Sequence, residues 1–273
     1  MDARRASKVG ASAVAGWGAL GALLVLVVAA VSVGAQEAAP GDLPEPLVLY
    51  NLMNAEADLI PNVATAATAP DLPLQVVHSA VQREPDGVWI TQASPMLRTP
   101  GSARALVEAL SGGVELRAMQ MAELTVEAVI TPADTAHEGP ARIVTLSADP
   151  YRRCFTLGQQ GDQYILRIRT TDTDENGTPD IVSTPGALEP RAQHVVATFG
   201  DDVARIYVDG IPVAEEARTG NFADWDPESL LVLGNEATGD RPWAGGFHLV
   251  AIYDIAMSPE QVQARYNELV ATL

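Results

Sequence analysis

The feature that most constrains this fold is a long series of short apolar runs. They begin near residue 47 and recur about every 8 to 15 residues, separated by segments rich in Pro, Gly, Asp or Ala. The run at 163–170 alternates, with Tyr164, Leu166 and Ile168 on one face and Ile165, Arg167 and Arg169 on the other. This pattern predicts an all-β protein, an antiparallel sandwich of two sheets. The predicted strands are 47–50, 74–77, 88–91, 124–130, 141–146, 154–158, 163–170, 194–199, 205–209, 230–233 and 248–253.

One short helix is clearly predicted, at the C-terminal end. Ser258 is a suitable N-cap, Pro259 suits the first helical position, and Gln261 completes a capping-box pattern. A shorter helix is predicted at 103–110. We expect the C-terminal helix to pack on the edge of the sandwich through an apolar face that comprises Val262, Tyr266, Leu269 and Val270.

The N-terminal segment reads as a membrane-targeting helix. Arg4, Arg5 and Lys8 precede an uncharged stretch, 9–36, whose apolar centre is long enough to span a bilayer. Two interpretations stay open: a retained transmembrane signal anchor at 9–35, which we favour, and a signal peptide cleaved after Ala35. The anchor would present a face of small residues to another membrane helix, and these are Ala11, Ala15, Gly18 and Ala22.

Both interpretations predict the same topology. Positive charge before the helix keeps residues 1–8 in the cytoplasm, and the remainder is translocated. Residues 36–46 are a Pro-rich linker, and 47–273 form one domain. The composition is rich in Ala and Arg, with Lys8 as the only lysine, which indicates a bacterial protein. We therefore expect a single-pass protein of the inner (cytoplasmic) membrane, with its domain in the periplasm.

The charge of the chain excludes one class of partner. Formal net charge is −18, and beyond residue 8 the chain carries 14 Arg against 34 acidic residues, a net charge of −20. Such a body repels nucleic acid and anionic lipid headgroups. It could attract cations or a basic protein surface, or serve solubility alone. The single cysteine, Cys154, cannot form an intrachain disulfide, and we expect it to be a buried small hydrophobe.

Three segments of the domain resemble a known family. They are 139–170, the stretch HVVATFGDDVARIYVDG at 194–210, and 225–263, which contains RPWAGGFHLVAIYDIAMSPEQV. Their order and spacing are similar to those of laminin-G-like domains in the concanavalin A-like lectin/glucanase superfamily, from about residue 115 to 273. The resemblance implies a two-sheet jelly roll whose first strands come from 46–114. It implies no single function, because this fold hosts lectins, glycan hydrolases and interaction modules.

Hydrolytic chemistry has little support in the sequence. The resemblance to the glucanase branch would imply the motif Glu-x-Asp-x-x-Glu on one strand, and this motif is absent from the sequence. Glu123 and Glu127 lie four residues apart and would share a strand face, but no acidic residue stands between them as the motif requires. We therefore expect that the protein is not an enzyme and has no catalytic residues.

One loop has two interpretations. The stretch 172–180 reads D-x-D-x-N-G-x-x-D, which places oxygen side chains at alternate positions before a glycine turn, as in short calcium loops. The twelfth position is Ser183 and not Glu, so a calcium loop would be incomplete. We favour a polar hairpin with Asn-Gly at its tip. The alternative is a weak calcium site with the ligands Asp172, Asp174, Asn176 and Asp180; no other cofactor is expected.

A carbohydrate site would need an exposed aromatic platform beside polar groups. Trp89, Trp225 and Trp243 are candidates for the platform, although aromatic residues make up only 5% of the chain and semi-buried packing is the simpler role. The predicted ligand or partner surface comprises Trp225, Asn235, Asp240, Arg241 and Trp243.

Three functions follow, from different classes. The leading hypothesis is a non-enzymatic accessory or scaffold subunit of a bacterial membrane complex, in a respiratory or photosynthetic electron-transfer assembly. Its partners would be other subunits, contacted through the helix and the acidic sandwich. The alternative is a periplasmic or surface lectin that binds glycans, with or without calcium. The third is a glycoside hydrolase that depends on Glu123 or Glu127.

Overall fold

A computed structural model describes residues 43–77, 81–91, 96–112 and 122–272 of the chain. All of them belong to one compact unit, Ala38–Leu273. The predicted cytoplasmic segment, the anchor with Ala11, Ala15, Gly18 and Ala22, and most of the linker lie outside the described residues. Among the helices of the described part, none is long and apolar enough to cross a membrane.

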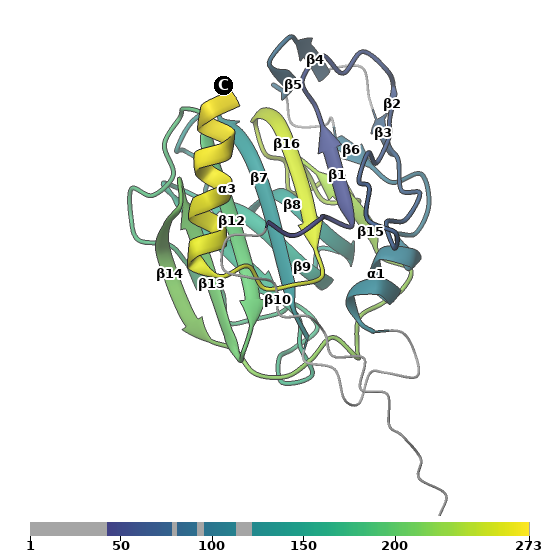
Figure 1. Cartoon of the computed structure of the whole chain (residues 1–273), viewed down its shortest axis with the longest axis vertical. Coiled ribbons are helices and arrows are strands. Elements are labelled where there is room, and N and C mark those ends of the chain that lie inside the picture. The colour runs from purple at the N-terminus through teal and green to yellow at the C-terminus, as the bar shows by residue number, and fades with distance from the viewer. Residues whose placement is uncertain (1–42, 78–80, 92–95, 113–121, 273) are drawn as a thin grey trace, which may run out of the picture. The chain divides into compact units, whose positions relative to one another are not determined.

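The described residues form two antiparallel sheets of eight strands each (Figure 1). In sheet A the order is β14-β13-β12-β7-β16-β5-β4, and β1 also pairs with β16. In sheet B the order is β11-β10-β9-β8-β15-β6-β3-β2. The strands of sheet A are β1 (Val48–Asn51), β4 (Val81–Glu84), β5 (Gly87–Ile90), β7 (Leu124–Pro132), β12 (Gln193–Gly200), β13 (Val203–Val208), β14 (Ile211–Ala217) and β16 (Gly245–Tyr253). Those of sheet B are β2 (Leu59–Ile60), β3 (Leu74–Val77), β6 (Met96–Arg98), β8 (Ala141–Asp149), β9 (Arg152–Gln160), β10 (Gln163–Ile168), β11 (Ile181–Val182) and β15 (Leu230–Leu233).

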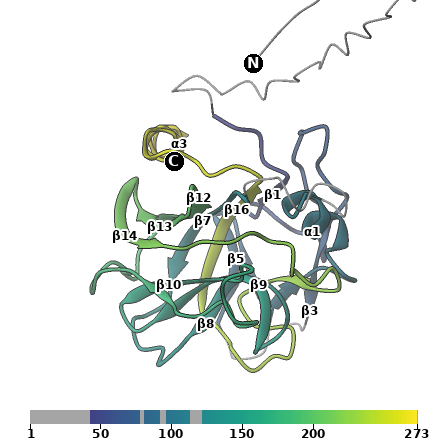
Figure 2. The same ribbon diagram turned by 90° about the horizontal axis from the view of Figure 1, so that it is seen from below.

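The core lies between the two sheets, which Figure 2 shows as stacked layers. Each strand turns alternate side chains inward, so Tyr164, Leu166 and Ile168 of β10 are buried, as their alternation predicts. Burying a large aliphatic or aromatic side chain contributes about 1.5–3 kcal/mol. Cys154 is fully buried in this core, and burial raises the pKa of its thiol to about 12. Its predicted role as a small hydrophobe is confirmed.

Two helices complete the described fold, α1 (Arg104–Leu110) and α3 (Pro259–Thr272). Helix α3 covers the outer face of sheet A (Figure 2), over a small apolar cluster that includes Val196 and Val262. The capping box is present: Gln261 Oε1 accepts from the Ser258 backbone N–H at 3.0 Å, and Ser258 Oγ accepts from the Gln261 N–H at 3.3 Å. The predicted apolar face is shorter than expected, because Val270 is 54% exposed.

Candidate binding site

A pocket of about 340 Å³ lies where two loops meet at the rim of sheet B. One loop joins β7 to β8, and the other joins β15 to β16. We call it the rim pocket. It is lined by His137, Gly139, Pro140, Ala141, Asp240, Arg241 and Pro242.

Gln159 of β9 ties the two loops together from behind. Its side chain is fully buried. Nε2 donates to the carbonyl oxygens of Asp134 (2.8 Å) and Gly161 (3.0 Å), and Oε1 accepts from Trp243 Nε1 (2.8 Å). Asp134 belongs to the first loop and Trp243 to the second. One buried amide therefore fixes both walls of the rim pocket.

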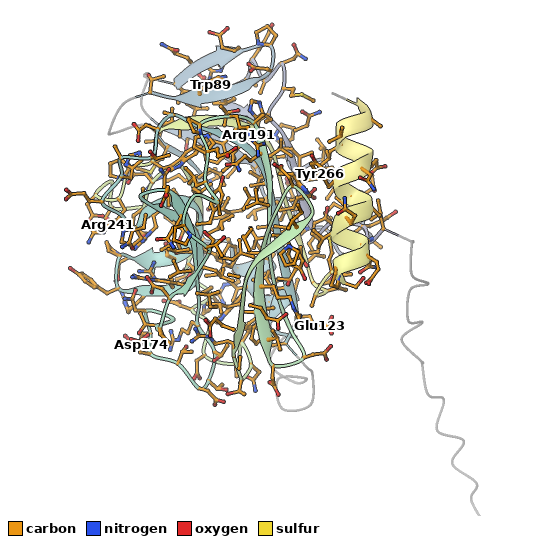
Figure 3. The ribbon with its side chains drawn as sticks, turned by 90° about the vertical axis from the view of Figure 1, so that its left-hand side faces the viewer. Trp89, Glu123, Asp174, Arg191, Arg241 and Tyr266 are labelled. Atoms are coloured by element: carbon orange, nitrogen blue, oxygen red, sulfur yellow. The ribbon has the colours of Figure 1, made fainter. Side chains whose placement is uncertain are left out.

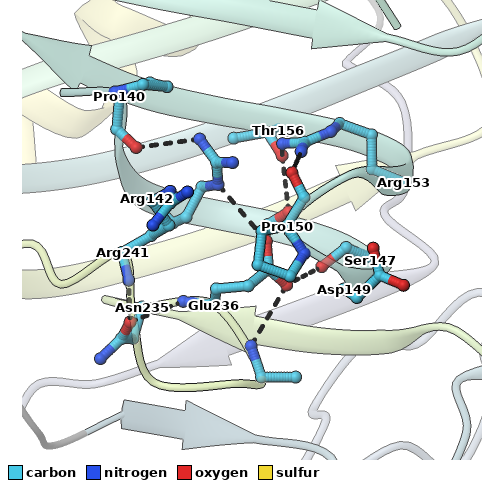
Figure 4. A network of polar contacts seen from close by, with 12 residues as sticks. Pro140, Arg142, Ser147, Asp149, Pro150, Arg153, Thr156, Asn235, Glu236 and Arg241 are labelled. Carbon is cyan, nitrogen blue, oxygen red and sulfur yellow. Dashed lines mark hydrogen bonds and ion pairs between the residues drawn. The ribbon is translucent and has the colours of Figure 1, made fainter. Parts of the chain in front are cut away.

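A buried ion pair makes a second tie (Figure 4). Arg142 Nη1 donates to the Pro140 carbonyl at 2.9 Å, and Arg142 Nε lies 3.4 Å from Glu236 Oε2. Glu236 also accepts a hydrogen bond from the Ser147 hydroxyl. Burial lowers the pKa of Arg142, and the Glu236 carboxylate opposes that shift. Buried ion pairs hold geometry more reliably than they add stability, so this pair is best understood as positioning the two loops.

The opening of the rim pocket carries a carboxylate and a guanidinium side by side. Asp240 Oδ2 lies 3.0 Å from Arg241 Nη1, and Asp240 Oδ1 accepts from the Thr238 hydroxyl at 2.5 Å. Arg241 is fixed by its backbone N–H, which donates to Asn235 Oδ1 at 3.0 Å. Figure 3 shows Arg241 pointing outward, on the side of the sandwich away from α3.

His137 adds a third polar group to the rim pocket. Its Nε2 is buried and has no hydrogen-bond partner among the residues that the structure describes. An orphaned polar atom in a pocket favours a water or a ligand group there. The rim pocket thus offers a carboxylate, a guanidinium and an imidazole nitrogen between two proline rings. Such groups suit a ligand with several hydroxyls, which donate to Asp240 and accept from Arg241.

The predicted aromatic platform is not formed by Trp225 or Trp243. Trp225 is 2% exposed and donates from Nε1 to the Arg169 carbonyl at 2.7 Å, while Trp243 is fully buried. Trp89 is half-buried on β5 and donates to Asp86 Oδ1 at 3.2 Å. Of the predicted ligand surface, Asp240 and Arg241 line the rim pocket and Asn235 orders its loop.

The loop at 172–180 is organised by its own hydrogen bonds. Asp174 Oδ1 accepts from the backbone N–H groups of Asn176 (3.1 Å) and Thr178 (2.8 Å). Asp180 forms a two-pronged ion pair with Arg167, and Asp172 accepts from Thr219. No group of three metal-ligating side chains occurs within the described ranges. The calcium alternative at Asp172, Asp174, Asn176 and Asp180 stays a prediction that nothing here tests. Strands β10 and β11 pair as the predicted hairpin.

Glu123 and Glu127 have different surroundings. Glu123 lies just before β7 and accepts a hydrogen bond from the Ala256 backbone N–H at 3.3 Å, whereas Glu127 lies within the strand. Glu127 is fully buried beneath α3, where its oxygens accept from His194 (2.9 Å), Arg265 (3.0 Å) and Tyr253 (2.6 Å). Glu127 of β7 thus joins α3, through Arg265, to the neighbouring strands β12 and β16, through His194 and Tyr253.

Comparison with known proteins agrees with this fold. A family model described as the concanavalin A-like lectin/glucanases superfamily matches residues 110–263. A Trypanosoma rangeli sialidase in complex with sialic acid is similar over 82% of this chain and 33% of its own, with 14% identity and a TM-score of 0.57. No curated protein matches the sequence.

Botulinum neurotoxin binding domains are also similar. The binding domain of neurotoxin DC in complex with SialylT has a TM-score of 0.59 and 10% identity, over 82% of this chain and 52% of that one. The same domain in complex with rat synaptotagmin II has a TM-score of 0.58 and 11% identity, over 81% of this chain and 51% of that one. The chain thus spans about a third of the sialidase and half of the toxin domains. At these identities the likeness shows the fold alone.

Proposed function

Because the chain belongs to the concanavalin A-like lectin/glucanases superfamily, we propose that it is a non-catalytic carbohydrate-binding module whose sugar site is the rim pocket. One observation carries the proposal: Asp240, Arg241 and the unpartnered His137 Nε2 converge on one pocket. Buried contacts of Gln159, and of Arg142 with Glu236, fix the two loops of that pocket before a ligand binds. Pre-ordered polar groups bind with less loss of conformational entropy.

The negative charge of the protein favours a neutral sugar over an anionic one as the ligand. Beyond residue 8 the chain carries a net charge of −20, and Asp240 stands at the pocket itself. A polyanionic glycan would be repelled during approach, while a neutral one would not. We therefore propose a neutral oligosaccharide with neighbouring hydroxyls as the ligand. The similar structures in complex with sialic acid and with SialylT support carbohydrate binding in general and do not define the sugar.

The absence of a catalytic role is part of the proposal. Glu127 accepts three hydrogen bonds under α3, and Glu123 accepts from the Ala256 N–H at 3.3 Å. Neither carboxylate lines the rim pocket. We expect no turnover of any glycan that the protein binds.

The test is a panel of neutral and acidic glycans on the full-length chain in mild detergent, followed by titration calorimetry with each ligand found. Asp240→Ala and Arg241→Ala should each weaken binding by about tenfold or more, since a lost hydrogen bond to a charged group costs about 1.5–3 kcal/mol. Arg205→Ala, at the exposed Arg205–Glu215 pair of sheet A, is the matched control and should bind normally. A broad panel without a neutral ligand, or binding that survives both substitutions, would refute the proposal.

We further propose that the module is held at the periplasmic surface of a bacterial inner membrane, as an accessory subunit of a membrane complex. The observation that favours this placement is the uncharged stretch 9–36 behind Arg4, Arg5 and Lys8. The small-residue face of that stretch would contact the helix of a partner subunit. The sandwich would then present the rim pocket to glycans in the periplasm.

A further inference from the structure

A second pocket lies under the C-terminal half of α3, on the outer face of sheet A. We call it the helix pocket; its volume is about 100 Å³. In Figure 3, Tyr266 and Arg191 lie on this side of the sandwich and Arg241 on the other. The lining residues that matter here are Val129, Arg191, His194, Asp209, Tyr266 and Val270.

His194 is held rigidly at the floor of the helix pocket. Its Nε2 lies 2.9 Å from Glu127 Oε1, and its ring stacks on Tyr266 at 6.0 Å between centroids. The oxygens of Glu127 also accept hydrogen bonds from Arg265 Nε at 3.0 Å and from the Tyr253 hydroxyl at 2.6 Å. Glu127 is thus a carboxylate that can only accept, so His194 Nε2 carries the proton.

The other ring nitrogen of His194 has no protein partner. Its side chain is 3% exposed, and Nδ1 is buried without a hydrogen bond to any residue that the structure describes. With the proton on Nε2, Nδ1 of the singly protonated ring is a hydrogen-bond acceptor. A buried acceptor without a hydrogen-bond partner destabilises the folded state. A ligand with a hydrogen-bond donor beside His194 Nδ1 would therefore be favoured in the helix pocket.

The electrostatics around the helix pocket favour a cation. Asp209 Oδ1 accepts from the His194 N–H at 2.9 Å, and Oδ2 pairs with Arg191 at 2.8 Å. Helix α3 has no basic residue in its last turn, so the negative end of its dipole is uncompensated. Arg191 and Asp209 line the helix pocket, and the ion pairs around it bring in three more carboxylates and one more guanidinium group: Glu127, Glu189, Glu268 and Arg265.

We propose that the helix pocket binds a primary ammonium group carried on a short aliphatic stem, the chemistry of a lysine side chain or a free alkylamine. The ammonium has three donors, and His194 Nδ1 and the Asp209 carboxylate are acceptors for two of them. The stem packs against Val129 and Val270, and the Tyr266 ring provides a π face for the charge. This site is independent of carbohydrate binding, because it shares no residue with the rim pocket.

The experiment titrates the full-length chain with n-butylamine and with Nα-acetyl-lysine N-methylamide, and uses n-butanol and butyrate as neutral and anionic matches. The ¹⁵N shift of His194 Nδ1 reports contact with the ligand directly. We expect the amine to bind at least about tenfold more tightly than butanol or butyrate. Binding of both amines assigns the site to lysine side chains, and binding of butylamine alone assigns it to free amines.

Two variants make the result specific. Asp209→Asn removes the carboxylate charge, and Val270→Trp fills the helix pocket from an exposed position, so each should weaken amine binding by about tenfold or more. Val182→Trp, at another exposed valine, is the matched control and should bind normally. Equal binding of butylamine, butanol and butyrate would overturn the proposal. So would an Nδ1 signal that no probe moves, which would mean that the helix pocket holds only water.

Discussion

Gln159 is the residue on which the rim pocket most depends. Gln159→Leu keeps the size of the side chain but leaves the Trp243 Nε1–H and the Asp134 and Gly161 carbonyls without their partner. We expect a loss of about 2–4 kcal/mol in the free energy of unfolding, since each unsatisfied buried group costs about 1–3 kcal/mol. Urea unfolding measures it.

Gln160 provides the control, because it is the exposed neighbour on the same strand. Gln160→Leu should change stability by no more than about 0.5 kcal/mol. Equal unfolding midpoints for the two variants would show that Gln159 does not tie the loops. The pair also shows what the sequence could not provide. Gln159 and Gln160 are adjacent and chemically identical, and the sequence alone does not show which of them is buried. Gln159 is buried because the two loops meet over it.

The other residues of the rim pocket follow the same logic. Asp240 and Arg241 could be proposed from sequence because they stand in a polar turn beside Trp243. His137, Arg142 and Glu236 were not proposed as site residues, because His137 lies about a hundred positions from Asp240 and no spacing links them. The prediction that Trp225 and Trp243 form a binding platform was wrong because both rings are buried between the sheets. The sequence shows a large ring beside polar residues but not its burial.

At the scale of elements, α3 is joined to strand β7 through the Glu127 carboxylate, which accepts from Arg265 of α3. The pKa of Glu127 is lowered in the folded state, so the folded protein loses this proton more readily than the unfolded chain does. Its stabilising effect is present at neutral pH and is lost as pH falls below about 4.5, through the folded pKa. Glu127→Gln should lower the free energy of unfolding by about 3 kcal/mol at pH 7. It should also reduce the loss of stability between pH 7 and 3 (the acid limb), and urea unfolding over this pH range measures both.

Glu123, just before β7, is the comparison, because its pKa is shifted in the opposite direction. Burial raises its pKa in the folded state, and the carboxylates of Asp201 and Asp254 add to the shift. Its contribution is fully present at low pH and is lost as pH rises through the folded value. Glu123→Gln should therefore leave stability at pH 7 unchanged or slightly higher. An identical acid limb in both variants would contradict the assignment of Glu127 as the anchor of α3.

The elements predicted from sequence share a strong local signal. The capping box placed the start of α3, and the apolar runs at 74–77 and 230–233 coincide with β3 and β15. The missed strands were β2, β4, β6 and β14, three of which have four residues or fewer, and β11 was predicted only as the return of the hairpin. In β14 most side chains are exposed, and its pairing comes from β13 rather than from any apolar alternation. Such strands are defined by their neighbours and leave little trace in local sequence.

At the scale of the whole molecule, the order of strands in the sheets comes from pairs distant in sequence. β7 lies between β12 and β16, and β15 joins β8 to β6. Short apolar runs predict that such strands exist but not their order, and the family resemblance implied only a two-sheet jelly roll. The same sandwich fold can serve a periplasmic lectin or a subunit of a membrane complex. The function of the whole molecule therefore depends also on whether the chain is anchored in a membrane.

The N-terminal stretch provides the last prediction. If residues 9–35 are a retained anchor, the chain in native membranes should have its full-length mass, resist alkaline extraction and run with a larger assembly in mild detergent. Gly18→Leu or Ala22→Leu should then release it from the assembly with the sandwich still folded, because bulk on the small-residue face prevents close helix approach. Ala13→Leu, on the opposite helix face, should have no effect. A soluble chain that begins near Gln36 would instead establish a cleaved signal peptide and a secreted lectin.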